Sequence, residues 1–265
     1  MTWFEALILG IIQGLTEFLP VSSSGHLEIG NVLLGIEPGN NLLFAVIVHA
    51  ATALSTVLVY YREIGSIISG LFQFRWNESY DFSLKIIISM IPVGIVGIFF
   101  EDQVEAFFSG NLVLVGGMLL VTATLLYVTY FKGSDKKNVD YPRSLLIGLA
   151  QALAILPGIS RSGATIATAL IAGVDKTKAT RFSFLMVLPP ILGASVLKFK
   201  DYIEAPTSSS GLPMASLVIG FLAAFIAGYL ACRWMIGIVR KGKLTYFAVY
   251  CTIVGLIALI SGIIL

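Results

Sequence analysis

Charged residues are scarce in this chain of 265 residues: Asp, Glu, Lys and Arg make up 12% of it, against 57% apolar residues. Soluble domains carry about a quarter of their residues as charged side chains. The mean hydropathy of +0.92 points the same way. This composition excludes an ordinary soluble domain, and the net charge of +2 is too small to suggest a nucleic-acid partner.

Cysteine is nearly absent as well. Cys232 and Cys251 are the only two, and both fall inside apolar runs, which argues against a disulfide framework. The first residues include Glu5 but no Lys or Arg, so we expect no cleaved signal peptide. We therefore interpret the chain as an integral membrane protein.

Long charge-poor runs support that interpretation. A helix rises 1.5 Å per residue, so about 20 apolar residues cross the ~30 Å hydrocarbon layer. Two shorter runs contain prolines, which neighbouring helices of a bundle tolerate. Six runs are long enough to span, or nearly so: 42–60, 86–100, 112–131, 182–199, 214–239 and 244–265.

The distribution of Lys and Arg predicts the topology. Basic residues gather in four connections, whereas the stretches 30–41, 101–111 and 201–213 contain none. The positive-inside rule places basic connections in the cytoplasm. With the four basic connections on one side, the six spans alternate in direction, three in each half; these connections are 62–85, 132–143, 176–181 and 240–243.

Two segments 138 residues apart are versions of each other. Several residues match at this single offset: Gln13 with Gln151, Ser22 with Ser160, Ser24 with Ser162, and Gly25 with Gly163. Three of the positions at which the copies differ carry chemistry: the first copy has Glu17, Ser23 and His26 where the second has Ile155, Arg161 and Ala164. Acid/base groups thus occur in one copy and a fixed cation in the other, which indicates an anionic ligand between them.

Each copy has a proline and a Ser/Gly cluster at its middle, as a helix-turn-helix that dips into the bilayer would need. We predict an all-α membrane protein with six transmembrane helices and two re-entrant helix-turn-helix hairpins in an inverted-topology repeat. One membrane domain, 1–265, would comprise repeats 1–131 and 144–265 and a cytoplasmic linker, 132–143. The alternative is that each copy is a kinked spanning helix.

Gln13 and Glu17 are four residues apart and so share one helix face. A carboxylate at membrane depth costs several kcal/mol unless it is paired or bound to a cation. One interpretation makes Glu17 a structural partner of Arg161. We favour the other, in which Glu17 is a general base or a metal ligand.

The serines predict two helix N-termini that face one another. A serine caps the first turn of a helix, and free N–H groups there attract anions. Two such termini and the fork of Arg161 would make a phosphate site. His26 follows Ser23 by three residues, near enough to take a proton from its hydroxyl. We interpret His49, in the middle of an apolar run, as structural.

These motifs resemble the undecaprenyl-pyrophosphate phosphatase family associated with bacitracin resistance. The resemblance covers essentially the whole chain and rests on the spacing of Gln13 and Glu17 and on the segments 19–26 and 157–165. It implies hydrolysis of a C55 polyprenyl diphosphate to the monophosphate carrier of peptidoglycan synthesis, in the inner cell membrane with the site on the outer face. A homodimer stays open.

The resemblance also implies roles for individual residues. Glu17 would do metal or acid/base work, Ser23 would be the nucleophile, His26 its proton partner and Arg161 a phosphate ligand. Direct attack by water, with Ser23 only positioning the phosphate, stays open. We expect six further residues to contact the substrate: Gln13, Ser22, Ser24, Ser160, Ser162 and Thr165.

We expect a divalent cation, Mg²⁺ or Ca²⁺, between Glu17 and the diphosphate. Many members of the family have Glu where this chain has Gln13, so one anionic ligand is missing here.

Two other functions are weighed against the phosphatase. A lipid flippase is one alternative, because inverted repeats are common in transporters. A phosphatase with a histidine nucleophile ranks low, since no histidine follows His49.

Overall fold

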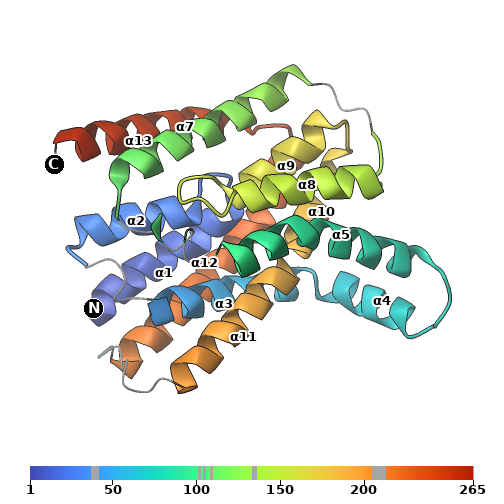
Figure 1. Cartoon of the computed structure of the whole chain (residues 1–265), viewed down its shortest axis with the longest axis horizontal. Coiled ribbons are helices and arrows are strands. Elements are labelled where there is room, and N and C mark those ends of the chain that lie inside the picture. The colour runs from blue at the N-terminus through green and yellow to red at the C-terminus, as the bar shows by residue number, and fades with distance from the viewer. Residues whose placement is uncertain are drawn as a thin grey trace.

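A computed structural model describes residues 1–36, 42–100, 103, 106–107, 110–132, 136–204 and 213–264, and helices account for nearly all of its regular structure (Figure 1). The described residues contain no β-strand beyond a single bridge between Lys137 and Val174. The α-helices are α1 (Trp3–Phe18), α2 (Ser23–Leu33), α3 (Leu42–Val59), α4 (Tyr61–Leu71), α5 (Glu78–Phe99), α7 (Leu112–Val128), α8 (Tyr141–Leu153), α9 (Arg161–Ile171), α10 (Lys176–Met186), α11 (Leu188–Glu204), α12 (Met214–Arg240) and α13 (Thr245–Ile264); a short 3₁₀ helix, Thr129–Phe131, extends α7.

Five helical segments within the described residues are long and apolar enough to cross a membrane: Glu78–Phe99, Leu112–Phe131, Lys176–Leu197, Met214–Arg240 and Thr245–Ile264. A sixth is the pair α3 and α4, which is bent by 78°. The five segments match five predicted spans, although those that start at Glu78 and Lys176 begin earlier than their apolar runs. The remaining predicted span, 42–60, corresponds to α3, which reaches the length of a span only if α4 is counted with it. The all-α class is therefore confirmed. Residues 133–135 of the predicted linker lie outside the described residues, as do parts of the three predicted loops without basic residues: 37–41, 101–102, 104–105, 108–109 and 205–212.

The helices α1, α2, α8 and α9 are shorter, with 16, 11, 13 and 11 residues. Each is below the length of about 20 residues that a helix needs to span hydrocarbon. The α1 helix packs on α2, and α8 packs on α9, so each pair forms a helical hairpin. The turn of the first hairpin contains Pro20 and that of the second contains Pro157, where a missing N–H disfavours helix continuation.

The two hairpins pack on the bundle in the same way. The first helix of each hairpin lies along a long helix of the other half: α1 on α12, and α8 on α5. A small residue permits each approach. A Cβ on Gly10 would lie 2.5 Å from the carbonyl oxygen of Gly220, and one on Gly148 would lie 2.3 Å from that of Ser89. Gly10 and Gly148 are themselves 138 residues apart, so the repeat extends to helix packing.

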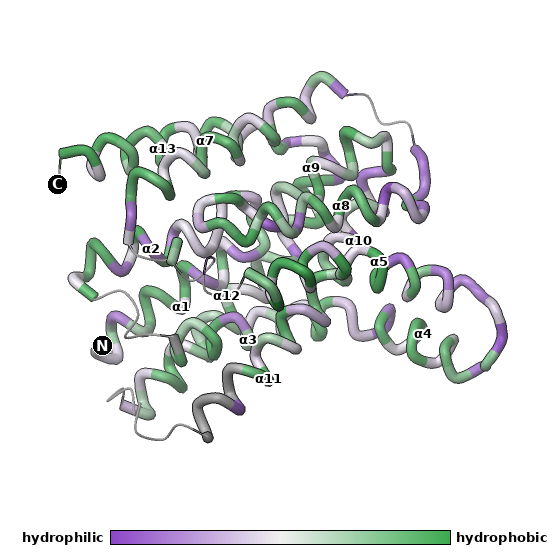
Figure 2. The backbone as a smooth tube through the Cα atoms, viewed as in Figure 1, coloured by the Kyte–Doolittle hydropathy of each residue, from purple (hydrophilic) through white to green (hydrophobic). Residues whose placement is uncertain are grey.

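The four basic connections meet at one end of the bundle, where polar residues gather in Figure 2. Arg181 of α10 pairs with Glu63 of α4 at 2.5 Å. The hydroxyl of Tyr141, at the start of α8, donates to Asp81 of α5 at 2.7 Å. These contacts agree with the prediction that the basic connections share one side.

Candidate active site

The turns of the two hairpins are in direct contact. A Cβ on Gly25 would lie 3.0 Å from the Cα of Gly158, and one on Gly163 would lie 3.2 Å from the Cβ of Pro20. The hydroxyl of Ser162 donates to the backbone carbonyl of Leu19 at 3.2 Å. The structure therefore brings the two matching motifs together, as their offset predicts.

Both turns lead into a serine-capped helix. Ser22 Oγ accepts from the N–H of Gly25 at 3.2 Å, and Ser160 Oγ accepts from the N–H of Gly163 at 3.0 Å. In each copy the capping hydroxyl also lies 3.3 Å from the hydroxyl of the serine two residues on, which is Ser24 in the first and Ser162 in the second. Two helix N-termini of the predicted kind thus meet at the contact between the hairpins.

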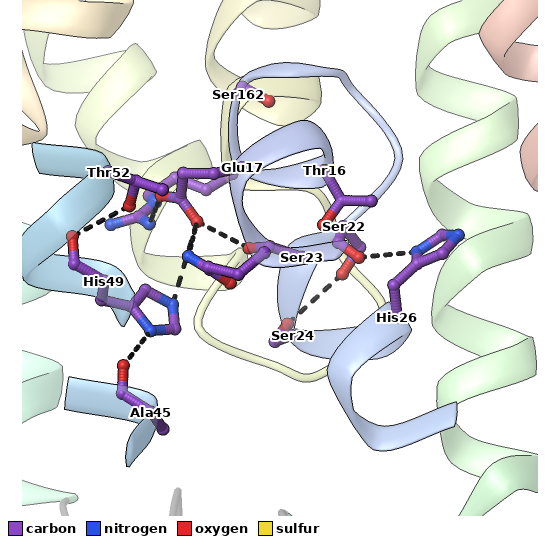
Figure 3. Close-up of polar contacts among 12 residues, drawn as sticks. Thr16, Glu17, Ser22, Ser23, Ser24, His26, Ala45, His49, Thr52 and Ser162 are labelled. Atoms are coloured by element: carbon purple, nitrogen blue, oxygen red, sulfur yellow. Dashed lines mark hydrogen bonds and ion pairs between the residues drawn. The ribbon is translucent and has the colours of Figure 1, made fainter. Parts of the chain in front are cut away.

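Glu17 is the centre of the polar cluster between the turns (Figure 3). Its Oε1 forms an ion pair with Arg161 Nη2. Its Oε2 accepts from Ser23 Oγ at 2.7 Å and from Gln13 Nε2 at 3.0 Å. The Glu17 side chain is only 6% exposed. The carboxylate is therefore compensated by a cation and two donors, as a buried charge requires.

His26 does not contact Ser23 in this arrangement. Its Nδ1 lies 2.8 Å from the carbonyl oxygen of Ser22, and its Nε2 lies 2.8 Å from the hydroxyl of Tyr250. The His26 ring also stacks on the Tyr250 ring, with centroids 5.6 Å apart. The hydrogen bond expected from the three-residue spacing is replaced by one between Ser23 and Glu17. The physical reason is that α13 offers His26 both a ring face and a hydroxyl.

His49, which we interpreted from the sequence as structural, lies beside the cluster. Its Nε2 is 3.8 Å from Glu17 Oε2, and its Nδ1 is 2.8 Å from the carbonyl oxygen of Ala45. Figure 3 places His49 and His26 on opposite sides of Ser23. One signal in the sequence could have revealed His49: at the 138-residue offset it corresponds to Val187, as Glu17 corresponds to Ile155. The chemical groups of the first half extend to α3.

Two of the expected substrate contacts serve the fold in this structure. Thr165 is 1% exposed, and its hydroxyl donates to the backbone carbonyl of Arg161 at 2.9 Å. Ser160 is equally buried behind its capping bond. Both residues stabilise the first turn of α9, which contains Arg161.

A pocket opens beside the cluster. Its polar wall includes Glu17, Arg161, Ser162, Thr52 and Thr56, and its apolar wall is formed by Phe18, Ala53, Phe184, Val187 and Ile191. The apolar side leads to α11, on which Val196 and Leu197 are more than 60% exposed. A ligand with an anionic head and a hydrocarbon tail matches this pairing of walls.

The residues around Glu17 suit a hard cation held mainly by substrate. The described residues contain no group of three or more His, Cys, Asp and Glu side chains that could hold a metal ion by themselves. Mg²⁺ is commonly bound by one or two carboxylates together with substrate phosphates. Besides Glu17, the amide oxygen of Gln13 is buried and has no hydrogen-bond partner, so it is an oxygen donor left over in the cluster. This donor set fits such an ion.

Comparison with known proteins agrees with the geometry. The family model described as bacitracin resistance protein BacA matches residues 6–257. The chain belongs to this family. A protein of Bacteroides fragilis named undecaprenyl-diphosphatase is 54% identical over 261 residues, covering 98% of each chain. Proteins with the same name from Bacteroides thetaiotaomicron and Methanobrevibacter smithii are 53% and 42% identical, each covering 98% or more of both chains. Family membership and the apolar helices together make the chain a multi-pass membrane protein.

Proposed function

We propose that this protein hydrolyses undecaprenyl diphosphate to undecaprenyl phosphate and inorganic phosphate. It thereby recycles the lipid carrier of peptidoglycan synthesis and confers resistance to bacitracin. The observation that carries the proposal is the cluster of Glu17, Ser23 and Arg161 at the meeting point of two serine-capped helices, next to a pocket with an apolar wall. Relatives over the full length carry the corresponding name.

The diphosphate would bind at the two helix N-termini, with its tail along the apolar wall. The guanidinium of Arg161 has five N–H donors, of which the ion pair with Glu17 uses one. Its remaining donors can address two oxygens of the terminal phosphate. The N-terminal turns of α2 and α9 add partial positive charge from opposite sides. Phosphoryl transfer depends mostly on such positioning and charge neutralisation.

Ser23 would be the nucleophile and Glu17 its base. The Ser23 hydroxyl already donates to Glu17 Oε2 at 2.7 Å, within the range of a general base. As Ser23 Oγ bonds to the terminal phosphorus, its proton passes to Glu17 and the bond from phosphorus to the bridging oxygen breaks. Undecaprenyl phosphate leaves with that oxygen. Water then attacks the phosphorus of the phosphoserine and its hydroxyl stays on the phosphate. The bond from phosphorus to Ser23 Oγ breaks as Glu17 returns its proton to that oxygen. The remaining proton of the water leaves to solvent with the phosphate.

A divalent cation, Mg²⁺ or Ca²⁺, would be held by the carboxylate of Glu17 and the amide oxygen of Gln13 together with the diphosphate. When bound, it would neutralise charge on the phosphate oxygens. Gln13 is the only one of these protein donors with a buried oxygen that lacks a hydrogen-bond partner within the described residues of the cluster.

We also propose the inverted-topology repeat, with repeats 1–131 and 144–265, a linker at 132–143 and two re-entrant hairpins. The short helices of both hairpins and their reciprocal packing on α12 and α5 support it. The basic end would face the cytoplasm of the inner cell membrane, with the site open toward the outer face. Labelling by a membrane-impermeant thiol reagent at Tyr246→Cys and Phe74→Cys in intact cells would test the orientation.

Phosphate release from a C55 diphosphate by the purified protein tests the activity. We expect turnover by the native chain, none by Glu17→Gln, and full turnover by Glu78→Gln, which removes an exposed carboxylate elsewhere. Chelator should abolish turnover, and added Mg²⁺ or Ca²⁺ should restore it. Absence of phosphate release by the folded native chain would refute the proposal. Full activity in chelator would remove the cation and leave Glu17 only its role as a base.

A further inference from the structure

The cluster around Glu17 contains one group that the proposed reaction does not use. We propose that His49 Nε2 would hold the divalent cation together with the carboxylate of Glu17. This inference rests on the proposed cation site and goes beyond it, since it assigns a nitrogen donor and therefore a preference among metals.

The orientation of the ring is the first evidence. His49 Nδ1 lies 2.8 Å from the carbonyl oxygen of Ala45, and a carbonyl can only accept, so Nδ1 carries a proton. In the neutral ring the other nitrogen, Nε2, then presents a lone pair. Metal-binding histidines commonly donate their second N–H to a backbone carbonyl in this way, which sets the tautomer and the ring direction.

The distance between His49 Nε2 and the carboxylate of Glu17 is the second piece of evidence. Nε2 lies 3.8 Å from Glu17 Oε2, which is too far for a direct hydrogen bond. Bonds of about 2.0–2.2 Å join divalent metals such as zinc to imidazole nitrogen and carboxylate oxygen. Two such bonds can bridge the observed gap.

The position of His49 on a helix is the third piece of evidence. His49 stands within α3, and its own carbonyl oxygen accepts from the buried hydroxyl of Thr52 at 2.9 Å. The imidazole is therefore held on a helix and not on a loop. The side chain stays 29% exposed, which leaves a route for an ion to enter. Thr52 and Glu17, which lie next to His49, both belong to the wall of the pocket.

A nitrogen ligand has a measurable consequence. Carboxylate and amide oxygens suit Mg²⁺, Ca²⁺ and Mn²⁺, whereas imidazole favours later transition metals. Removing the imidazole should weaken binding of Co²⁺ more than binding of Mn²⁺ or Ca²⁺. We expect the loss for Co²⁺ to be at least the roughly 10–100-fold that outer-shell changes cost.

Electron spin-echo spectroscopy of the Mn²⁺-loaded protein, prepared in detergent without a histidine tag, tests the assignment directly. An imidazole bound to Mn²⁺ produces a characteristic ¹⁴N modulation. The chain has only two histidines, His26 and His49, so the signal has few sources. We expect the modulation in the native protein and in His26→Gln, and its loss in His49→Gln with Mn²⁺ still bound. Labelling histidine with ¹⁵N should change the pattern without any substitution, which covers the case of a His49 variant that does not fold.

The outcomes separate this inference from the proposed function. Mn²⁺ bound in a Glu17-dependent manner without imidazole modulation would overturn the role of His49 and leave the cation site intact. The finding would then point to a protonated imidazole paired with Glu17. No Glu17-dependent Mn²⁺ binding, with phosphate still released, would overturn both the cation site and the His49 assignment while the phosphatase stands.

Discussion

The turn before α2 and the turn before α9 share one set of backbone contacts but carry different chemistry. Each has a capping serine bonded to an N–H three residues on, and a second serine 3.3 Å from the first. Between these serines the first copy has Ser23 and the second has Arg161. The two turns therefore present matching helix N-termini that differ in the side chain between the serines, a hydroxyl in the first copy and a guanidinium in the second.

The backbones of the two capping serines differ as well. Ser22 has φ of 71° and ψ of 99°, whereas Ser160 has φ of −73° and ψ of 118°. A residue other than glycine rarely adopts a positive φ, and strained residues of this kind gather at functional sites. In the second turn the positive φ falls on Gly158, where no Cβ opposes it. Strain is thus present in the copy that carries Ser23.

Exchange of one hydroxyl in each copy should give the largest contrast. Ser23→Ala removes the group that donates to Glu17, so turnover should fall roughly 10³-fold or more, as for other enzymes that lose a nucleophile. Ser162→Ala removes one donor near the phosphate and should cost about 1.5–3 kcal/mol, partly as a higher KM. Both kcat and KM would be measured in one detergent. Equal losses in the two variants would mean that the chemistry belongs to the other copy.

Arg161→Lys should have the next largest effect. The planar guanidinium can address Glu17 and phosphate together, and an ammonium cannot reproduce that fork. We expect a loss of about 10²–10³-fold in kcat, by analogy with removal of an oxyanion donor. Arg233→Lys, on the exposed surface of α12, is the matched control. If Arg161→Lys turned over as fast as the native protein, the role of Arg161 would be limited to neutralising charge.

Tyr250→Phe examines a contact that the second copy lacks, since Ala164 stands where the first has His26. The change removes the hydrogen bond to His26 Nε2 and keeps a ring for stacking. If His26 carries protons during turnover, kcat should fall by a factor equivalent to about 0.5–1.5 kcal/mol, and the pH dependence of kcat should shift. Tyr246→Phe, on the same helix and exposed, should change neither. An unchanged pH profile would make the contact structural.

The smallest effects should come from the caps. Ser22→Gly removes a capping hydroxyl but relieves the strain of a positive φ. We therefore expect the free energy of unfolding to stay the same or to rise by up to about 1 kcal/mol. Ser160→Gly relieves no strain, so the free energy of unfolding should fall by a few tenths of a kcal/mol. Thermal unfolding in detergent measures both. If Ser22→Gly lowered the stability more than Ser160→Gly, the first turn would not be strained.

Two features of the site could not be predicted from local spacing. The spacing of three positions from Ser23 to His26 allows a contact on one helix face, but the His26 ring instead forms a hydrogen bond with Tyr250, 224 residues away along the chain. His49 is surrounded by apolar residues in the sequence, and nothing local indicates which face of α3 meets Glu17. Both side chains have free rotation about their own bonds, so packing from other helices selects their partners.

Composition and local pattern determined by themselves that this chain is helical, that it has about six membrane-spanning segments and that two serine-capped turns are related by a repeat. These properties depend on helix length, on the penalty for burying charge in lipid and on hydrogen bonds within four residues, all of which are local. Only the tertiary structure decided that Glu17 pairs with Arg161 and bonds Ser23, and that His49 joins them. The reason is that a buried carboxylate takes its partners from whatever helices close packing brings near, and α1, α2, α3 and α9 meet only in the folded bundle.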